Sequence, residues 1–99
     1  MDTRYESNIL TNNSTEGRFE MEVDGAIAFI KYKTMPDAVA LLHTEVPSVL
    51  EGRGVATALV EKTLMYLEER NQKIAPICPY VSAFLKRHPD WQRIVVQSF

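Results

Sequence analysis

The chain has 99 residues, of which 45% are apolar and 24% charged, a composition typical of one globular domain, so we expect residues 1–99 to form a single domain with a polar N-terminal segment at 1–17. The net charge of −2 gives no general attraction to nucleic acid, and no apolar run is long enough to span a membrane. One cysteine excludes an internal disulfide and, with no apolar signal segment, predicts a cytoplasmic protein.

The first half of the chain predicts antiparallel strands. Ile9 and Leu10 favour a short edge strand, and residues 12–15 read as a loop. The runs 18–23 and 26–34 flank an Asp-Gly pair, a two-residue turn that matches the twist of paired strands. A register that pairs the residues directly flanking this turn gives one apolar face. That face consists of Phe19, Met21, Val23, Ala26, Ala28 and Ile30.

The middle of the chain predicts a strand followed by a helix. A turn at 35–37 precedes residues 38–46, which are apolar enough for a strand inside a sheet and which end at Pro47. Residues 55–70 show helical periodicity, and Asn71 is a plausible left-handed stop. The expected apolar stripe of this helix consists of Ala56, Leu59, Val60, Thr63, Leu64 and Leu67.

The C-terminal part predicts a short strand at 74–77 and a second helix that begins at Pro79 and ends at His88-Pro89. Residues 91–96 favour a last strand or an extended tail. Strand, helix and strand at this spacing form a crossover whose two strands are parallel. We therefore predict a three-layer α+β fold, with a mixed, mostly antiparallel sheet, one parallel β-α-β crossover and two flanking helices.

The most informative segment is the loop before the first helix, Leu50-Glu51-Gly52-Arg53-Gly54-Val55-Ala56. Glycines let the backbone approach a ligand closely, and the first N–H groups of a helix point outward without internal partners. Together they form an anion site, and they suit a phosphate group. The loop matches neither the dinucleotide fingerprint nor the P-loop. A tight turn without a ligand is the alternative reading of this pattern.

Four residues near the predicted strand ends are candidates for catalysis. Cys78 falls at the N-cap of the second helix, where the helix dipole stabilises a thiolate, so it is a candidate nucleophile or proton carrier. Tyr80 could protonate a leaving group, and His43 or Glu45 could act as a general base. His43 and Glu45 should share one face of their strand, about 7 Å apart. Structural roles for all four residues stay open, and the two histidines and one cysteine predict no metal site.

Four segments then occur in an order and at a spacing that resemble one protein family. They are His43-Thr44-Glu45-Val46-Pro47, Glu51-Gly52-Arg53-Gly54-Val55-Ala56, Pro76-Ile77-Cys78-Pro79-Tyr80-Val81 and Lys86-Arg87-His88-Pro89. With this pattern the chain resembles the GCN5-related N-acetyltransferases, and most of all their small, single-domain branch. The resemblance runs from about Phe19 to Trp91.

The resemblance implies an acetyl-CoA-dependent N-acetyltransferase whose co-substrate enters a gap between two parallel strands. The pantetheine arm would follow the strand that ends at Glu45 and Val46. The pyrophosphate would sit on N–H groups of Gly52 to Ala56, with the Arg53 side chain free to help. In the small branch the cysteine that aligns with Cys78 lies near the acetyl group, which allows direct transfer or a covalent acetyl-cysteine route.

Two departures from larger members matter. Those members carry Gln or Arg shortly before the glycines, where this chain has Glu51, and an acid is unfavourable beside pyrophosphate. The chain also lacks the two helices that complete the acceptor site in larger members. An open site suits a protein or peptide amine, or completion by a partner or second copy, so the chain could be a monomer or a homodimer. The alternative function is a CoA-binding module without turnover.

Overall fold

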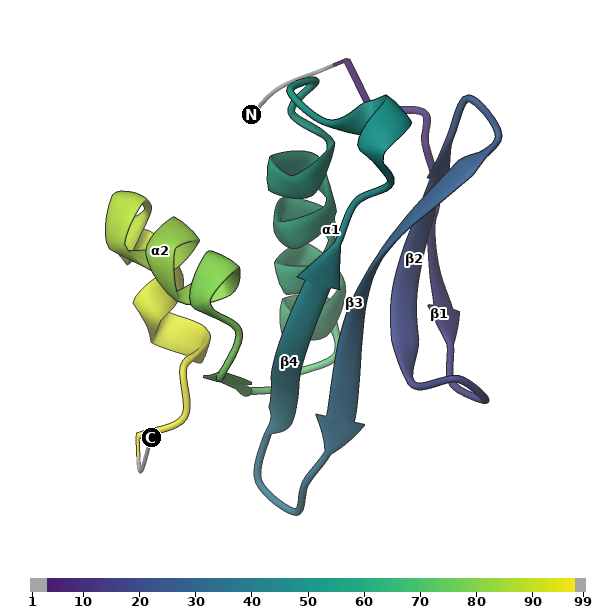
Figure 1. The fold of residues 1–99 in the computed structure, drawn as a ribbon. Coiled ribbons are helices and arrows are strands. Elements are labelled where there is room, and N and C mark those ends of the chain that lie inside the picture. The colour runs from purple at the N-terminus through teal and green to yellow at the C-terminus, as the bar shows by residue number, and fades with distance from the viewer. Residues whose placement is uncertain (1–3, 98–99) are drawn as a thin grey trace.

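The computed structural model describes residues 4–97, which form a five-stranded sheet in the order β1-β2-β3-β4-β5 (Figure 1). Strands β1 to β4 pair antiparallel, whereas β4 and β5 are parallel. The expected α+β fold with one parallel crossover is therefore confirmed. The strands are β1 Leu10–Asn13, β2 Arg18–Val23, β3 Ala26–Thr34, β4 Val39–Glu45 and β5 Ile74–Pro76. The helices are the 3-10 helix η1 Ser48–Leu50, α1 Val55–Glu69, α2 Pro79–Arg87 and the 3-10 helix η2 Pro89–Ile94.

The β2–β3 hairpin has the predicted register, with Val23 opposite Ala26. Asp24 and Gly25 adopt φ values of 50° and 80°, so both central residues of the turn lie in the left-handed region, as a type I′ hairpin turn requires. The turn chemistry and the alternation of apolar residues point to the same register. Because of this agreement, the face that carries Phe19 is buried as expected.

The edge strand β1 differs from the prediction. Asn12 and Asn13 were expected in a loop, but they pair with Phe19 and Arg18 of β2. Ile9 lies outside the strand and is 80% exposed. Polar side-chain contacts replace apolar burial here, because the Tyr32 hydroxyl donates a 2.6 Å hydrogen bond to Asn12 Oδ1. Apolar periodicity alone therefore could not locate this strand.

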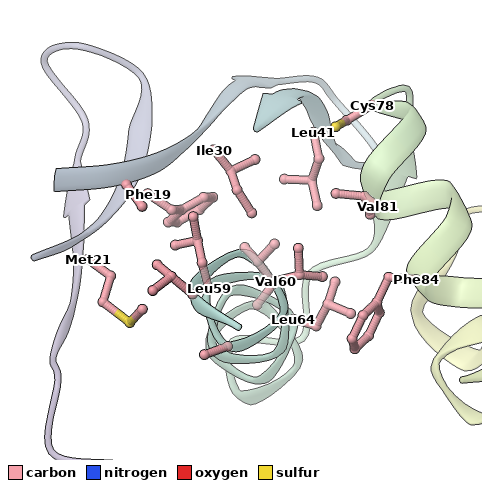
Figure 2. Close-up of a cluster of buried hydrophobic side chains, with 14 of the residues drawn as sticks. Phe19, Met21, Ile30, Leu41, Leu59, Val60, Leu64, Cys78, Val81 and Phe84 are labelled. Carbon is pink, nitrogen blue, oxygen red and sulfur yellow. The ribbon is translucent and has the colours of Figure 1, made fainter. Parts of the chain in front are cut away.

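Helix α1 packs against one face of the sheet, and its buried side chains meet those of β2, β3, β4 and α2 in one cluster (Figure 2). Ala56 is only half-buried, whereas Val55 and Ala58 are buried, so the predicted stripe is shifted at the start of the helix. The N-cap residue Gly54 lies in the left-handed region, and Val55 directly after it is the first buried residue of the helix. Asn71 has a φ of 58°, as predicted for a left-handed stop.

The parallel pairing of β4 and β5 is short. It covers Val39 to Leu41, opposite Ile74 to Pro76, and a hydrogen bond from the Cys78 N–H to the Leu41 carbonyl, 2.8 Å long, follows it. Strand β4 then continues for four more residues beyond this pairing. These four residues have no partner in β5, because β5 ends at Pro76, opposite Leu41.

The β3–β4 register also shifts, and no residue pattern predicts this irregularity. Lys31 pairs with His43 but Tyr32 pairs with Leu41, so Leu42 has no residue directly opposite. The shift falls where β4 passes the end of β5. Irregularities of this kind bend a strand and strengthen its local twist. The shift therefore falls at the point along β4 after which this strand has no β5 partner.

The prediction of a last strand or an extended tail at 91–96 is wrong for most of its length. Residues Pro89–Ile94 form η2 instead, and only an isolated bridge joins Val95 to Ile74. Pro89 favours the first position of a helical turn, and Ile94, which is 5% exposed, anchors the segment in the core. The second helix ends at Arg87, as predicted.

Candidate active site

The glycine loop joins two buried residues. Leu50 at the end of η1 and Val55 at the start of α1 are each 1% exposed. Between them Gly52 and Gly54 have φ values of 74° and 76°, a region in which side chains are strained. Helix α1 begins with a hydrogen bond from the Ala58 N–H to the Gly54 carbonyl, so the N–H groups that precede it have no acceptor within the helix.

These residues line a pocket of about 300 Å³. All the predicted cofactor-binding residues except Arg53 lie in its wall, and Tyr80 of α2 lines it as well. The pocket therefore brings the end of β4, the glycine loop and the start of both helices together. Its lining is Val46, Leu50, Glu51, Gly52, Gly54, Val55, Ala56 and Tyr80.

Arg53 points away from this pocket, toward the β2–β3 turn. Its Nη2 donates a 2.8 Å hydrogen bond to Asp24 Oδ2, and this bond raises the pKa of the Arg53 guanidinium above its ordinary value despite partial desolvation. The Arg53 carbonyl accepts a 2.6 Å hydrogen bond from the hydroxyl of Tyr5, which is 6% exposed. The Arg53 side chain therefore bonds within the protein. The resemblance had implied a side chain free to help at the pyrophosphate.

Cys78 and Tyr80 each contact a threonine that sequence reasoning missed. Cys78 is the N-cap of α2 and is 3% exposed, and its Sγ lies 3.4 Å from Thr44 Oγ1. The Tyr80 hydroxyl lies 2.9 Å from Thr57 Oγ1, in the first turn of α1. Strand alternation would have shown that Thr44 points away from its two neighbours, but only the packing of α2 shows what it meets.

His43 and Glu45 share one face of β4, as predicted, with 3.5 Å between Nε2 and Oε1 and each side chain 60% exposed. Thr44 between them pairs with the fully buried Ile30. Directly opposed residues of an antiparallel pair point to the same face, so Thr44 faces the α1 side. His43 and Glu45 therefore face the opposite side of the sheet, and the structure does not bring them against Cys78 or Tyr80.

A second groove is lined by none of the predicted site residues. This groove, of about 590 Å³, lies between the segment before β1 and α1, next to Ile9 and Met65. Across residues 4–97, no helix is long and apolar enough to cross a membrane. The same part of the chain holds no group of three or more His, Cys, Asp or Glu side chains arranged to hold a metal ion.

Comparison with known proteins supports one interpretation of this geometry. A family model described as GCN5-related N-acetyl-transferase matches residues 18–94, which include the pocket, Cys78 and both threonines.

The chain is also 37% identical over 51 residues to Protein NATD1 of Bos taurus, a match that covers 52% of this chain and 45% of that protein. Protein NATD1 of Mus musculus is likewise 37% identical over 51 residues, covering 52% of this chain and 46% of that protein. Protein NATD1 of Xenopus tropicalis is 35% identical over 51 residues, covering 52% of this chain and 47% of that protein. The chain thus spans about half the length of the curated relatives it matches.

Proposed function

The chain belongs to the GCN5-related N-acetyltransferase family, and from this premise we propose that it transfers an acetyl group from acetyl-CoA to an amine. The amine nitrogen attacks the thioester carbonyl carbon, the carbon–sulfur bond breaks and CoA leaves as a thiol. The amine loses one proton to a base, and the departing thiolate gains one from an acid.

The observation that carries this proposal is the pocket at the start of α1. Helix N-termini attract anions through unpaired N–H groups and through the helix dipole. The N–H groups of residues 52–56 would hold the diphosphate of acetyl-CoA there. Gly52 and Gly54 permit the close approach of backbone to phosphate, because neither carries a Cβ.

The reactive end of the co-substrate would lie beside β4. Past Leu41 this strand has no β5 partner, so its carboxyl end offers free main-chain groups to the pantetheine arm. Val46 ends this stretch and lines the pocket. We assign stabilisation of the oxyanion to a backbone N–H near Val46, an effect typically worth about 3 kcal/mol for one donor.

Tyr80 is the preferred proton donor to the leaving thiolate. It lines the pocket, and its contact with Thr57 Oγ1 orients the hydroxyl. Cys78 is less suited to a covalent role, because its side-chain contact is the hydroxyl of Thr44, which cannot take up the thiol proton as a base would. We therefore favour direct attack by the amine over an acetyl-cysteine intermediate, and assign Cys78 to the wall beside the acetyl group.

His43 and Glu45 would accept the amine proton. They lie on the sheet face away from α1, and each is 60% exposed, so an acceptor that arrives from that face would meet them first. An acceptor site open to solvent suits an amine carried by a protein or peptide. We leave a second copy of the chain as the alternative way to complete the site.

Titration with acetyl-CoA, followed by nuclear magnetic resonance and by release of free CoA thiol in the presence of an amine panel, tests the function. Amide shifts at residues 46–56 and around Cys78 together with thiol release would support the transferase. Binding without turnover for every amine would favour a CoA-binding module. Undisturbed amides at Gly52 and Gly54 at millimolar acetyl-CoA would refute both functions.

A further inference from the structure

The glycine loop is fastened by two residues that are distant in sequence. The Tyr5 hydroxyl donates to the Arg53 carbonyl at 2.6 Å, across 48 residues. On the side-chain end of the same residue, Arg53 Nη2 donates to Asp24 Oδ2 at 2.8 Å. Asp24 is itself held in a tight hairpin turn, with a φ of 50°. Arg53 is therefore hydrogen-bonded at its backbone to Tyr5 and at its side chain to Asp24, which belong to two separate segments.

The backbone contact has a directional consequence. The Arg53 carbonyl and the Gly54 N–H belong to one planar trans peptide unit, so they point in opposite directions. Fixing the carbonyl toward Tyr5 consequently fixes the Gly54 N–H away from Tyr5. Gly54 lines the pocket, whereas Arg53 does not. The Tyr5 hydroxyl thus sets the orientation of a peptide unit that would otherwise rotate between two flexible glycines.

We propose that Tyr5 and Asp24 are positioning residues for the diphosphate of the co-substrate, and that Arg53 acts as the anchor point of the loop rather than as a side-chain ligand of phosphate. This inference rests on the proposed function. Neither Tyr5 nor Asp24 touches the pocket. They act by holding the loop in its binding shape before the ligand arrives, which lowers the ordering cost of binding.

The test compares two tyrosine variants that each lose one hydroxyl. Tyr5→Phe removes the bond to the loop, and Tyr32→Phe removes the equally short 2.6 Å bond to Asn12 Oδ1, at the β1 edge. Each variant is titrated with CoA and assayed with acetyl-CoA and with S-acetylpantetheine, a donor that lacks the diphosphate. We expect Tyr5→Phe to raise the Kd of CoA and the KM of acetyl-CoA about fivefold, the range of one lost hydrogen bond, with kcat nearly unchanged.

The truncated donor separates positioning from general damage. Its kcat/KM should stay within about twofold of wild type in Tyr5→Phe, because it makes no diphosphate contact. Tyr32→Phe should leave all constants unchanged. Asp24→Asn, which weakens the grip on the side chain, should raise the Kd of CoA in the same direction.

Two results would overturn the inference. One is an unchanged Kd of CoA in Tyr5→Phe while the wild type binds CoA. The other is an equal loss with both donors, which would mark Tyr5 as a general structural residue. A wild-type chain that binds no CoA would refute the proposed function together with this inference, so the two failures are distinguishable.

Discussion

Thr44 Oγ1 lies 3.4 Å from Cys78 Sγ, and this contact joins the carboxyl end of β4 to the N-cap residue of α2. It forms immediately past the last main-chain hydrogen bond between the two parallel strands, from Cys78 to Leu41. A side-chain contact thus links the two segments beyond the point where their main-chain hydrogen bonds end. In the proposed function, the thioester would lie between this contact and the glycine loop.

Replacement of Tyr80 tests the assigned proton donor. Tyr80→Phe removes the hydroxyl that contacts Thr57 and keeps the ring. We expect kcat to fall about 100-fold, at the lower end of general acid catalysis, with little change in the Kd of CoA. Steady-state assays and a CoA titration measure the two effects. Tyr66→Phe, on the side of α1 that packs against Phe19 of β2, is the matched control, and a Tyr80→Phe enzyme with wild-type kcat would remove Tyr80 from the mechanism.

A methyl group at Gly52 tests the loop. Space is open around this position, with no atom within 4 Å of an added Cβ, so Gly52→Ala costs only the strain of a left-handed residue, about 1 kcal/mol. We expect a shift in the loop backbone and at least a fivefold weaker Kd for CoA, measured by calorimetry.

The control for Gly52→Ala is Gly17→Ala, remote from the loop. Gly17 is also left-handed, and an added Cβ would lie 3.2 Å from the Tyr32 carbonyl oxygen. It should destabilise the fold at least as much as Gly52→Ala while leaving the Kd of CoA unchanged. Equal losses of CoA affinity in both variants would mean that overall stability, and not loop shape, sets binding.

The acid in the loop should weaken binding of a polyanion. Glu51 is exposed and lines the pocket, so Glu51→Gln removes a repulsion across several ångströms of water. We expect the Kd of CoA to improve about twofold to threefold at low salt and the gain to shrink as salt rises. Glu16→Gln, at an exposed turn far from the pocket, controls for net charge. Weaker binding in Glu51→Gln would assign Glu51 a direct role in the ligand contact.

A pH series tests the ion pair between α1 and η2. Arg93 contacts Glu68 through two hydrogen bonds, at 2.6 and 3.0 Å, and these bonds lower the pKa of Glu68 below its reference value of 4.5. A carboxyl with a depressed pKa in the folded state stabilises the fold above the unfolded pKa, and the contribution is lost as pH falls through the folded pKa.

The thermal midpoint of the wild type should therefore drop more steeply than that of Glu68→Gln between about pH 6 and pH 3. Arg93→Gln should flatten the profile in the same way, because it removes the partner. Parallel profiles for the wild type and both variants would show that the pair contributes nothing to stability in solution. Differential scanning calorimetry across the pH series supplies the midpoints.

The hairpin and the crossover were predictable because several local signals agreed. Asp24 and Gly25 favour one turn type, the flanking alternation favours one register, and the helix between two apolar runs favours a parallel pair. Strand β1 and η2 were not predictable in the same way. Asn12 is held by a hydrogen bond from Tyr32, and η2 by tertiary contacts of Ile94, so neither segment carries a periodic signal of its own.

The candidate site also combines features that the sequence predicts with contacts that only the folded structure reveals. The sequence placed both the glycine loop and Tyr80 near the ends of predicted strands, and the structure brings these residues together in one pocket. It also predicted that His43 and Glu45 would share a face. It could not predict the partners of Arg53, because Tyr5 and Asp24 reach that residue only through the folded arrangement of three distant segments.

The seclusion of Cys78 makes it a natural reporter. It is the one cysteine of the chain and is 3% exposed, so an alkylating reagent can reach it only when the start of α2 lifts away from β4. Its labelling rate therefore measures how often the start of α2 separates from β4, without any engineered probe. A molecule bound between α2 and β4 should slow the alkylation of Cys78. Candidate donors and acceptors could then be screened by measuring the intact mass of the alkylated protein.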